Sequence, residues 1–368
     1  VEIADDKMLT KEILRNEGIP VPEGDIVRII DGALKLADDI SYPVVVKPMV
    51  GNHGRGITTN ITNKKDLKIA ILNSKKIHDT VIIEKYLEGY DHRLLVINNK
   101  FIAAARREAT PLIGDGKSTI KELIDKINQD PRRGIGHEKI LTRLEIDNMT
   151  IRLLKQNGLK LESILKKEEI FYPKSTANLS MGGIAVDVTD EVHPSIRVMA
   201  ERISKIINLN VIGIDIVAKD LRKPLTIDWG GVVEVNAAPG FRMHLKPYEG
   251  RPRMVSKPVI DMLFPPGSKH TLPIIAVTGT NGKTTTVTLI SHILKCCGNV
   301  VGTACTEGII IENQVIFNGD YSGPDGAKTI LKEPSIDHAV LEVARGGIIR
   351  RGLGFEKCDV GVFLNISN

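Results

Sequence analysis

The pattern of apolar and polar residues along the first part of the chain predicts alternating helices and strands. Apolar residues recur at the spacing of one helical face in residues 7–17, and a second helix is predicted over 64–75. Continuous apolar runs at 43–48 and 80–86 predict buried strands. Two more apolar runs flank the pair Asn98–Asn99, which is typical of a hairpin turn.

The following part of the chain adds a charged segment and further strands. Residues 116–167 are rich in charge, and their pattern predicts a helical insertion. The runs 183–188, 211–217 and 232–236 predict strands, and residues 195–207 predict a helix.

Residues 262–273 separate this region from a second one, because proline, glycine and serine cluster there. A chain of 368 residues also exceeds what one hydrophobic core usually serves. We therefore predict a first domain over 1–262, a linker over 263–272 and a second domain over 273–368. Strands and helices alternate in the second domain, which predicts an α/β fold with a parallel sheet.

Composition narrows the class of protein. Hydrophobic residues make up 42% of the chain and charged residues 26%, as in packed globular proteins. The net charge of +5 is spread along the chain without the interleaved aromatic residues that stack bases, so we expect no nucleic-acid partner. The cysteines lack the paired spacing of a zinc site. No apolar run approaches the roughly 20 residues that span a bilayer, and no signal peptide is recognisable. We expect a cytoplasmic protein with no membrane partner.

The stretch Val233–Gly240 places a carboxylate and a carboxamide in an apolar run. Successive side chains of a strand point to opposite faces, so Glu234 and Asn236 share one face. Asp215 interrupts another apolar run, where a lone carboxylate is costly unless it is paired or binds a cation. Such oxygen-rich strands supply ligands that magnesium accepts beside substrate phosphates. We predict a metal site; the alternative is that each acid is ion-paired with a neighbouring lysine or arginine.

Lys47 ends a valine-rich strand and precedes a glycine-rich turn. A triphosphate is its natural partner, because Gly51, Gly54 and Gly56 let backbone N–H groups approach anionic oxygens closely. Farther along, Asp91 suits a ribose hydroxyl. The alternative for that segment is an edge strand with a solvated acid.

These stretches resemble the ATP-grasp ligases, whose fold binds ATP between two small α+β subdomains with two magnesium ions bridging its phosphates. The resemblance implies that residues 84–87 face adenine, that Asp91 faces the ribose and that Asp215, Glu234 and Asn236 bind magnesium. The residues that it implies for ATP are Lys7, Lys47, Gly51, Gly54, Gly56, Glu84, Lys85, Leu87 and Asp91.

One position departs from the ATP-grasp pattern. Several family members have an arginine two residues before the metal-binding aspartate, and this chain has Gly213 there. Another cation must then stabilise the transferred phosphate, and we expect Arg242 or His244 as the catalytic residue. The alternative is that these two residues cap the following loop.

The second domain opens with a phosphate-binding loop. The sequence VTGTNGKTTT follows an apolar strand and precedes a helix, so its N–H groups and the helix N-terminus favour an anion. The loop is shorter than the usual GxxxxGK[ST] motif, but Lys283 still reaches outer phosphates and Thr284 can bind magnesium. The predicted nucleotide site comprises Gly279, Thr280, Asn281, Gly282, Lys283, Thr284 and Thr285.

Together with "HAVLEVARGG" and "DVGVFLNIS", this loop resembles the central domain of the Mur ligases, the amide-forming enzymes of cell-wall precursor synthesis. The resemblance implies that Glu342, at the end of its strand, helps to bind magnesium, and that Asn365 belongs to a further motif. The alternative for Glu342 is a surface ion pair.

An ATP-grasp domain followed by a Mur-like domain resembles the cyanophycin synthetase family, as do "GNHGRG", "DPRRGIGHEK" and "EVNAAPGFRMHL". The resemblance implies an ATP- and Mg²⁺-dependent enzyme with aspartate, arginine and a cyanophycin primer as substrates. The first domain would add aspartate to the polymer backbone, and the second would join arginine to the β-carboxylate, each through an acyl phosphate. It also implies that this chain is a piece lacking both ends, and that the full-length protein is a homo-oligomer.

Two further segments are expected to meet the substrate. Residues 175–183 combine hydroxyl groups with a Gly-Gly bend, and the charged insertion carries two adjacent arginines. The alternatives are a plain connecting loop and a solvated helical face. The expected substrate residues are Ser175, Asn178, Ser180, Gly182, Gly183, Arg132 and Arg133.

Three other functions are compatible with the sequence. One is an ATP-grasp peptide ligase of the glutathione-synthetase type, and another is a relative that polymerises aspartyl-arginine dipeptides with an inactive Mur-like domain. The third is a nucleotide-dependent scaffold without catalysis. The complete phosphate-binding loop after residue 278 favours the two-step ligase.

Overall fold

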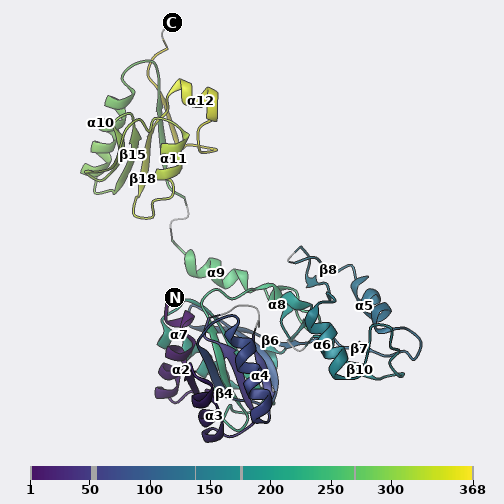
Figure 1. Cartoon of the computed structure of the whole chain (residues 1–368). Helices are drawn as coiled ribbons and strands as arrows, with labels where there is room; N and C mark the ends of the chain where they lie inside the picture. The colour runs from purple at the N-terminus through teal and green to yellow at the C-terminus, as the bar shows by residue number, and fades with distance from the viewer. Residues whose placement is uncertain (1, 51–55, 137, 175–176, 269–270, 367–368) are drawn as a thin grey trace. The chain divides into compact units, whose positions relative to one another are not determined.

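The computed structural model consists of two compact units, Val1–Leu263 and Phe264–Asn368, each described here by itself (Figure 1). The division falls at the proline- and glycine-rich segment. Among the described residues no helix combines the length and apolar character needed to cross a membrane. The structure describes residues 2–50, 56–136, 138–174, 177–268 and 271–366.

The first unit contains a four-stranded antiparallel sheet in the order β1-β4-β2-β3. Helices α3 (Ile30–Asp39) and α4 (Lys64–Lys75) bury their apolar sides against it. In the register of β2 and β4, Val45 pairs with Glu84, so Glu84 and Lys47 lie diagonally on the same face. The strands are β1 (Gly24–Val27), β2 (Val44–Pro48), β3 (Thr58–Ile61) and β4 (Val81–Lys85).

A second antiparallel sheet of five strands has the order β11-β6-β5-β12-β13. The predicted turn joins β5 and β6, where Asn98 and Asn99 take positive φ angles of 50° and 58°. The strands are β5 (Tyr90–Ile97), β6 (Lys100–Glu108), β11 (Ile184–Asp187), β12 (Val211–Ala218) and β13 (Gly230–Asn236).

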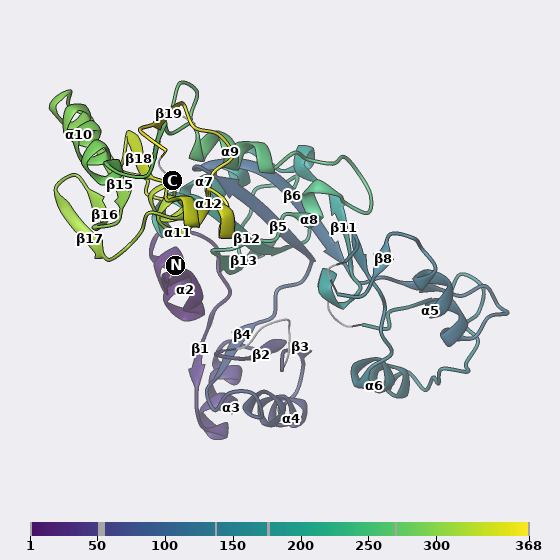
Figure 2. The same cartoon turned by 90° about the horizontal axis from the view of Figure 1, so that it is seen from above.

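Helices cover both faces of this sheet. On one face, α2 (Lys7–Asn16) and α7 (Pro194–Ile207) pack against alternate strand residues such as Val96 and Ile214. On the other face, α8 (Arg242–Leu245) and α9 (Ser256–Leu263) pack near Leu95. Figure 2 shows α7, α8 and α9 beside β5 and β6. A short helix, α1 (Glu2–Asp5), precedes α2.

The charged insertion has its own hydrophobic core, which includes Leu123, Leu154 and Phe171. In its described residues the segment contains two short helices and four short strands, so the predicted helical insertion is only partly helical. A capping box between Thr119 and Glu122 starts the first helix. The elements are β7 (Leu112–Ile113) with β10 (Ile170–Phe171), β8 (Arg133–Gly134) with β9 (Leu141–Thr142), α5 (Ile120–Asn128) and α6 (Asn148–Gln156).

The second unit is a three-layer α/β fold around a six-stranded sheet in the order β17-β16-β15-β18-β14-β19. Val287 of α10 packs on one side of the sheet, and Ile330 of α11 packs on the other. The elements are β14 (Ile274–Thr278), α10 (Lys283–Cys296), β15 (Val301–Cys305), β16 (Gly308–Ile311), β17 (Gln314–Asn318), α11 (Pro324–Ile330), β18 (His338–Glu342), α12 (Arg345–Arg351) and β19 (Val360–Phe363).

The mixed α/β fold class is confirmed, and the predicted parallel sheet of the second unit carries an antiparallel hairpin at one edge. Strands β14, β15, β18 and β19 are parallel, whereas β16 and β17 form an antiparallel hairpin. Glu312 turns this hairpin with a positive φ of 56°. A glutamate seldom takes this conformation, so the composition of the turn gave little signal.

Candidate functional site

Polar side chains collect on the face of the five-stranded sheet that α8 covers. In the antiparallel register, Asp215 on β12 lies opposite Glu234 on β13 and Arg93 on β5, and Gly213 lies opposite Asn236. The register between β12 and β13 shifts directly after Asp215. Such bulges are common beside functional sites because they redirect side chains. The three predicted oxygen donors therefore come from neighbouring positions on two adjacent strands.

Asp215 is buried and bound by two arginines. Arg93 binds both carboxylate oxygens, with its Nη2 3.0 Å from Oδ2, and Arg107 lies 3.1 Å from the same Oδ2. The amide nitrogen of Asn236 lies 3.5 Å from Oδ2. Burial alone would raise the pKa of Asp215, but the two guanidinium groups outweigh it and hold the pKa below its ordinary value. The ion-paired alternative from the sequence thus describes the protein contacts of this carboxylate.

Asp91, expected at the ribose, belongs to the same ion-pair network. Its Oδ1 accepts a hydrogen bond from Nη2 of Arg107 at 2.5 Å. Burial raises the pKa of Asp91, against the opposing charge of Arg107. Two carboxylates and two guanidinium groups therefore share this part of the sheet, and Asp91 lies beside Asp215.

Glu234, another predicted metal ligand, is partly exposed. Its side chain is 38% exposed, and Nζ of Lys7 lies 3.4 Å from its Oε1. Asn236 is also partly exposed. Among the described residues, no group of three or more His, Cys, Asp or Glu side chains is placed to hold a metal ion. A metal site here would also need the carboxamide oxygen of Asn236. The oxygen donors of Asp215, Glu234 and Asn236 fit a hard cation that keeps some of its water ligands.

Glu84 is buried between two lysines rather than open to a nucleotide base. Oε2 accepts a hydrogen bond from Lys47 at 2.7 Å, and Oε1 binds the ammonium of Lys11. The two lysines outweigh burial and lower the pKa of Glu84. Burial, with the charge of Lys47 beside it, lowers the pKa of Lys11 to about 7. Both oxygens of Glu84 have protein partners, so contact of residues 84–87 with adenine, which stays a prediction, would use the other atoms of this segment.

The backbone after Glu84 is partly used by the protein. The amide of Lys85 donates to the carbonyl of Glu23, and the amide of Tyr86 donates to the carbonyl of Pro43. The ammonium of Lys85 also donates to main-chain carbonyls, at 3.0 and 3.2 Å. Leu87 is half-buried.

The glycine-rich turn that was expected to hold phosphates is described only at its end. Gly56 has a positive φ of 72°, as a turn glycine does. Gly51 and Gly54 lie outside the described residues.

Arg93 lies beside Gly213, the position where the sequence lacks an arginine. A Cβ atom on Gly213 would lie 3.1 Å from Nη1 of Arg93 and 2.6 Å from Cβ of Pro239. The space beside Asp215 is therefore filled by an arginine from the neighbouring strand. Sequence reasoning missed Arg93 and Arg107, because their approach to Asp215 depends on strand register. The signal was an arginine at one end of each of two apolar runs.

The two predicted catalytic cations have different surroundings. Arg242 is partly exposed and donates to the carbonyl of Lys139 at 3.1 Å. His244 is 1% exposed, and neither of its ring nitrogens has a hydrogen-bond partner among the described residues. Burial, together with the charges of Arg93 and Arg107, lowers the pKa of His244 to about 3. The imidazole is therefore neutral, which corrects the expectation that His244 supplies positive charge.

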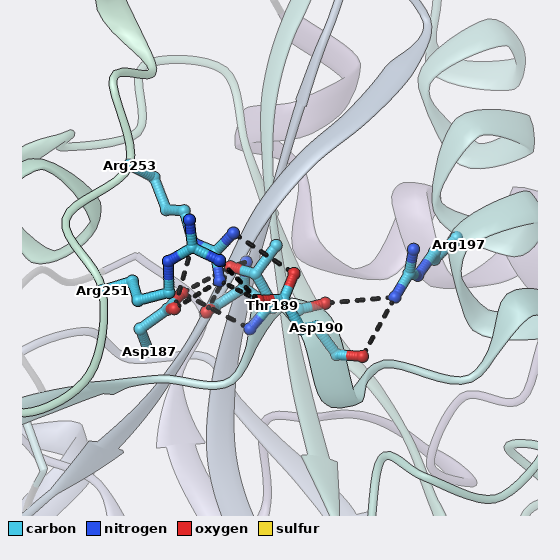
Figure 3. A network of polar contacts seen from close by, with 7 residues as sticks. Asp187, Thr189, Asp190, Arg197, Arg251 and Arg253 are labelled. Carbon is cyan, nitrogen blue, oxygen red and sulfur yellow. Dashed lines mark hydrogen bonds and ion pairs between the residues drawn. The ribbon is translucent and has the colours of Figure 1, made fainter.

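An ion-pair network fixes the chain that follows α8, residues 246–255, which we call the strap (Figure 3). Arg253 binds Asp187 at 2.6 Å and Asp190 at 2.7 Å, and its amide donates to the carbonyl of His244. Arg197 donates to the carbonyls of Thr189 and Asp190. These contacts join β11, the short helix η2 (Thr189–Glu191) and α7 to the strap, and so hold α8 over the sheet.

The loop expected to bind substrate is largely satisfied by its own contacts. Oδ1 of Asn178 accepts hydrogen bonds from the amide and hydroxyl of Ser180, which begin the short helix η1 (Leu179–Met181). The amide of Gly183 donates to the carbonyl of Asn178. Gly182 has a positive φ of 93°. Ser175 lies outside the described residues.

The adjacent arginines of the insertion differ. Arg133 is 3% exposed and donates to the carbonyls of Thr142 and Gly182 and to Thr110. Its guanidinium therefore holds the insertion to the 177–183 loop, which corrects its expected role in binding substrate. Arg132 is exposed, binds Asp130 at 2.8 Å and lies over the ring of Tyr248.

In the second unit, the loop predicted to bind phosphate lies between β14 and α10. Lys283 folds back and donates to the carbonyls of Gly279 and Thr280 at 3.0 Å. Gly282 precedes the helix with a φ of 83°. Asn365 accepts a hydrogen bond from the amide of Asn281 at 3.0 Å, so the predicted further motif lies against this loop. Thr285 is exposed.

Glu342 lies beside the loop rather than in a surface ion pair. It is 3% exposed, and its Oε2 accepts hydrogen bonds from the hydroxyl of Thr284 at 2.8 Å and the amide of Thr306 at 3.2 Å. The two hydroxyl groups of Thr284 and Thr306 are 3.0 Å apart. Sequence reasoning missed Thr306, which follows a parallel strand at the same edge of the sheet as Glu342.

Comparisons with known proteins agree with this arrangement. A RimK-like ATP-grasp domain model matches residues 4–121, and a Mur ligase middle domain model matches residues 277–368. The chain is 50% identical to the cyanophycin synthetase of Crocosphaera subtropica and 49% identical to that of Synechocystis, across 100% of this chain in both cases. The chain belongs to the cyanophycin synthetase family. It spans 42% of the length of these two family members.

More distant relatives share the first unit. A bifunctional glutathione biosynthesis protein of Clostridium perfringens is 32% identical over 71% of this chain and 34% of its own length. The crystal structure of a bifunctional glutathione synthetase from Pasteurella multocida has a TM-score of 0.54 at 31% identity, covering 72% of this chain and 37% of that one. The family assignment of the first unit as an ATP-grasp domain is confirmed.

We expect Arg253→Met to destabilise the first unit, because it leaves the buried carboxylate of Asp187 without its cation. The expected loss in free energy of unfolding is about 1–3 kcal/mol. The chain's single tryptophan is Trp229 in the first unit, so urea titration followed by its fluorescence reports on this unit. The matched control is Arg222→Met, which removes an exposed pair with Asp220. Equal losses in both variants would contradict the prediction.

Proposed function

We propose that the protein containing this chain is an ATP-dependent acid–amino-acid ligase that makes cyanophycin. The first unit adds aspartate to the polymer backbone, and the second joins arginine to the β-carboxylate of that aspartate. The observation that carries the proposal is that the chain is about half identical to cyanophycin synthetases along its whole length. The lysines Lys47 and Lys283, each beside a glycine-rich turn, support it.

Both steps use the same chemistry. An oxygen of the acceptor carboxylate attacks the γ-phosphorus of ATP, the bond to the bridging oxygen breaks, and ADP leaves. The amine nitrogen of the incoming amino acid then attacks the acyl carbon, phosphate leaves, and the nitrogen loses a proton. Phosphoryl transfer of this kind depends on positioning and neutralisation of charge more than on covalent help from the protein.

In the first unit, ammonium and guanidinium groups supply the charge. Lys7 and Lys47 bind phosphate oxygens, and Arg93 and Arg107 stabilise the transferred phosphoryl group. Arg93 takes this role because it fills the space beside Gly213 and binds Asp215.

The metal and the remaining residues complete the first site. Asp215, Glu234 and Asn236 would hold magnesium, which when bound neutralises the β- and γ-phosphates. His244 is buried and neutral, so we assign it no proton transfer. Arg242, which contacts the insertion, orients the acceptor.

In the second unit, the loop after β14 would bind the phosphates and magnesium with a different set of groups. The N–H groups of Lys283, Thr284 and Thr285 at the start of α10 bind the phosphates, and Lys283 exchanges its two carbonyl partners for a phosphate oxygen. Thr284 and Glu342 would hold magnesium, and their 2.8 Å hydrogen bond keeps both oxygens at one point.

The decisive experiment supplies the substrates separately. ADP release by the purified protein is measured with ATP and magnesium plus primer, aspartate, arginine or aspartyl-arginine dipeptide, singly and in pairs. The proposal expects release that needs primer and aspartate together, and further release on addition of arginine. Turnover without primer would indicate a peptide ligase of the glutathione type, to which the first unit is 32% identical. Turnover with the aspartyl-arginine dipeptide, but not with aspartate or arginine, would indicate that the second site is inactive.

We expect Glu234→Gln to lower aspartate-dependent ADP release at least about 100-fold, the scale of losing one group that stabilises charge in the transition state. The amide keeps the shape of the side chain but removes a charged oxygen donor. Because Glu234 is partly exposed, the variant should remain folded, and Trp229 fluorescence tests this. The control is Glu88→Gln, at an exposed pair with Lys219. Wild-type turnover in Glu234→Gln would contradict the assignment of Glu234 as a metal ligand. For Asp215→Asn we expect a similar loss of aspartate-dependent ADP release.

We expect Lys283→Met to abolish arginine-dependent ADP release while leaving aspartate-dependent release within about twofold, because the two nucleotide sites lie in separate units. The loss at the second site should reach about 100-fold or more. Product composition gives a second readout, since the polymer should retain aspartate and lose arginine. The control is Lys295→Met, on the same helix but near its far end. Parallel loss of both activities would contradict independent sites.

A further inference from the structure

A buried ion pair connects the two sheets of the first unit. Lys11 lies on α2, whose Leu14 belongs to the core of the five-stranded sheet. Glu84 lies on β4 of the four-stranded sheet. The two side chains are 3% and 5% exposed, and the ammonium of Lys11 binds Oε1 of Glu84. This contact crosses from one sheet to the other inside the protein, where salt screens charges much less than at the surface.

Each oxygen of Glu84 has a different lysine. Oε2 accepts from Lys47 at 2.7 Å, while Oε1 is held by Lys11. An ammonium group has three N–H donors, so Lys47 keeps donors for another anionic oxygen after binding Oε2. If Oε1 had no cation of its own, the carboxylate could turn both oxygens toward Lys47 and neutralise it more fully.

We propose that Lys11 is a positioning residue that, by holding one oxygen of Glu84, leaves Lys47 able to bind the triphosphate. This inference rests on the nucleotide site proposed above and deepens it. Neither the motifs of the sequence nor the family resemblance assigned a role to Lys11. The signal in the sequence is its spacing, four residues after Lys7 on the same helix face.

The charges around Lys11 support an indirect role. Lys11 shares a small cavity with Lys7 and Glu234, and the volume open to water there is about 10 Å³. This space is too small for a phosphate group beside Lys11. Lys11 therefore affects the nucleotide through Glu84, and its removal should change binding of the nucleotide more than the chemical step.

The test measures binding of a non-hydrolysable ATP analogue with magnesium by calorimetry, and KM and kcat for ATP with primer and aspartate. We expect Lys11→Met to weaken analogue binding and to raise KM about tenfold or more, the scale of one hydrogen bond to a charged group, with kcat changed less than about threefold. Lys11→Arg should restore most of the affinity. Lys64→Met, at an exposed pair with Asp38, is the matched control and should bind normally.

A double-mutant cycle separates the indirect role from direct phosphate contact. If Lys11 acts through Glu84, adding Lys11→Met to Glu84→Gln should change affinity less than about twofold. Additive losses would overturn the proposal, and so would unchanged binding by a folded Lys11→Met. Trp229 fluorescence checks folding, and Lys11→Gln, which keeps a donor without the charge, replaces Lys11→Met if that variant unfolds.

The outcomes also distinguish this inference from the proposed function. Analogue binding that depends on Lys11, in a protein without aspartate-dependent turnover, would overturn the proposed substrate and support the role of Lys11. Absence of analogue binding by the unaltered protein would overturn both.

Discussion

The first unit depends on the requirement that charges brought into its interior be paired there. Asp215 and Glu84 each interrupt an apolar strand, and each is held by two cations from other elements. Removing any one partner would leave a buried charge without compensation, which costs more than the pair itself contributes. These contacts therefore fix the positions of Arg93, Arg107, Lys11 and Lys47, which are the cations in and beside the proposed nucleotide site. The stability of the interior and the arrangement of the site come from the same contacts.

The sequence was sufficient for elements whose pattern is local. Helix α4 has the predicted bounds, and alternation along β12 and β13 placed Asp215 and Glu234 on strands that prove to be adjacent. Arg93 and Arg107 could not be assigned in this way, because their approach to Asp215 depends on the register of β5 and β6. Lys11 was also missed, because an amphipathic pattern does not show that a lysine on the helix is buried.

Positions around a parallel sheet were easier to infer in the second unit. The carboxyl ends of parallel strands meet at one edge, so a loop after β14 and a glutamate at the end of β18 must lie close together. The observed 2.8 Å bond between Thr284 and Glu342 follows from that topology. The hairpin β16–β17 lies on the side of β15 that faces away from β18, so missing it did not affect the placement of Glu342 beside the loop.

The two lysines proposed to bind phosphate, Lys47 and Lys283, donate hydrogen bonds to different kinds of acceptor. Lys283 donates to two neutral carbonyls of its own loop, and a phosphate, as an anion, binds an ammonium more strongly than they do. Lys47 donates to a carboxylate, which competes with phosphate on nearly equal terms. A lysine beside a buried glutamate can therefore bind a triphosphate well only if a second cation binds one of the two carboxylate oxygens of that glutamate. Lys11 meets this condition, which explains why a second lysine is buried at a point where apolar packing would otherwise be expected.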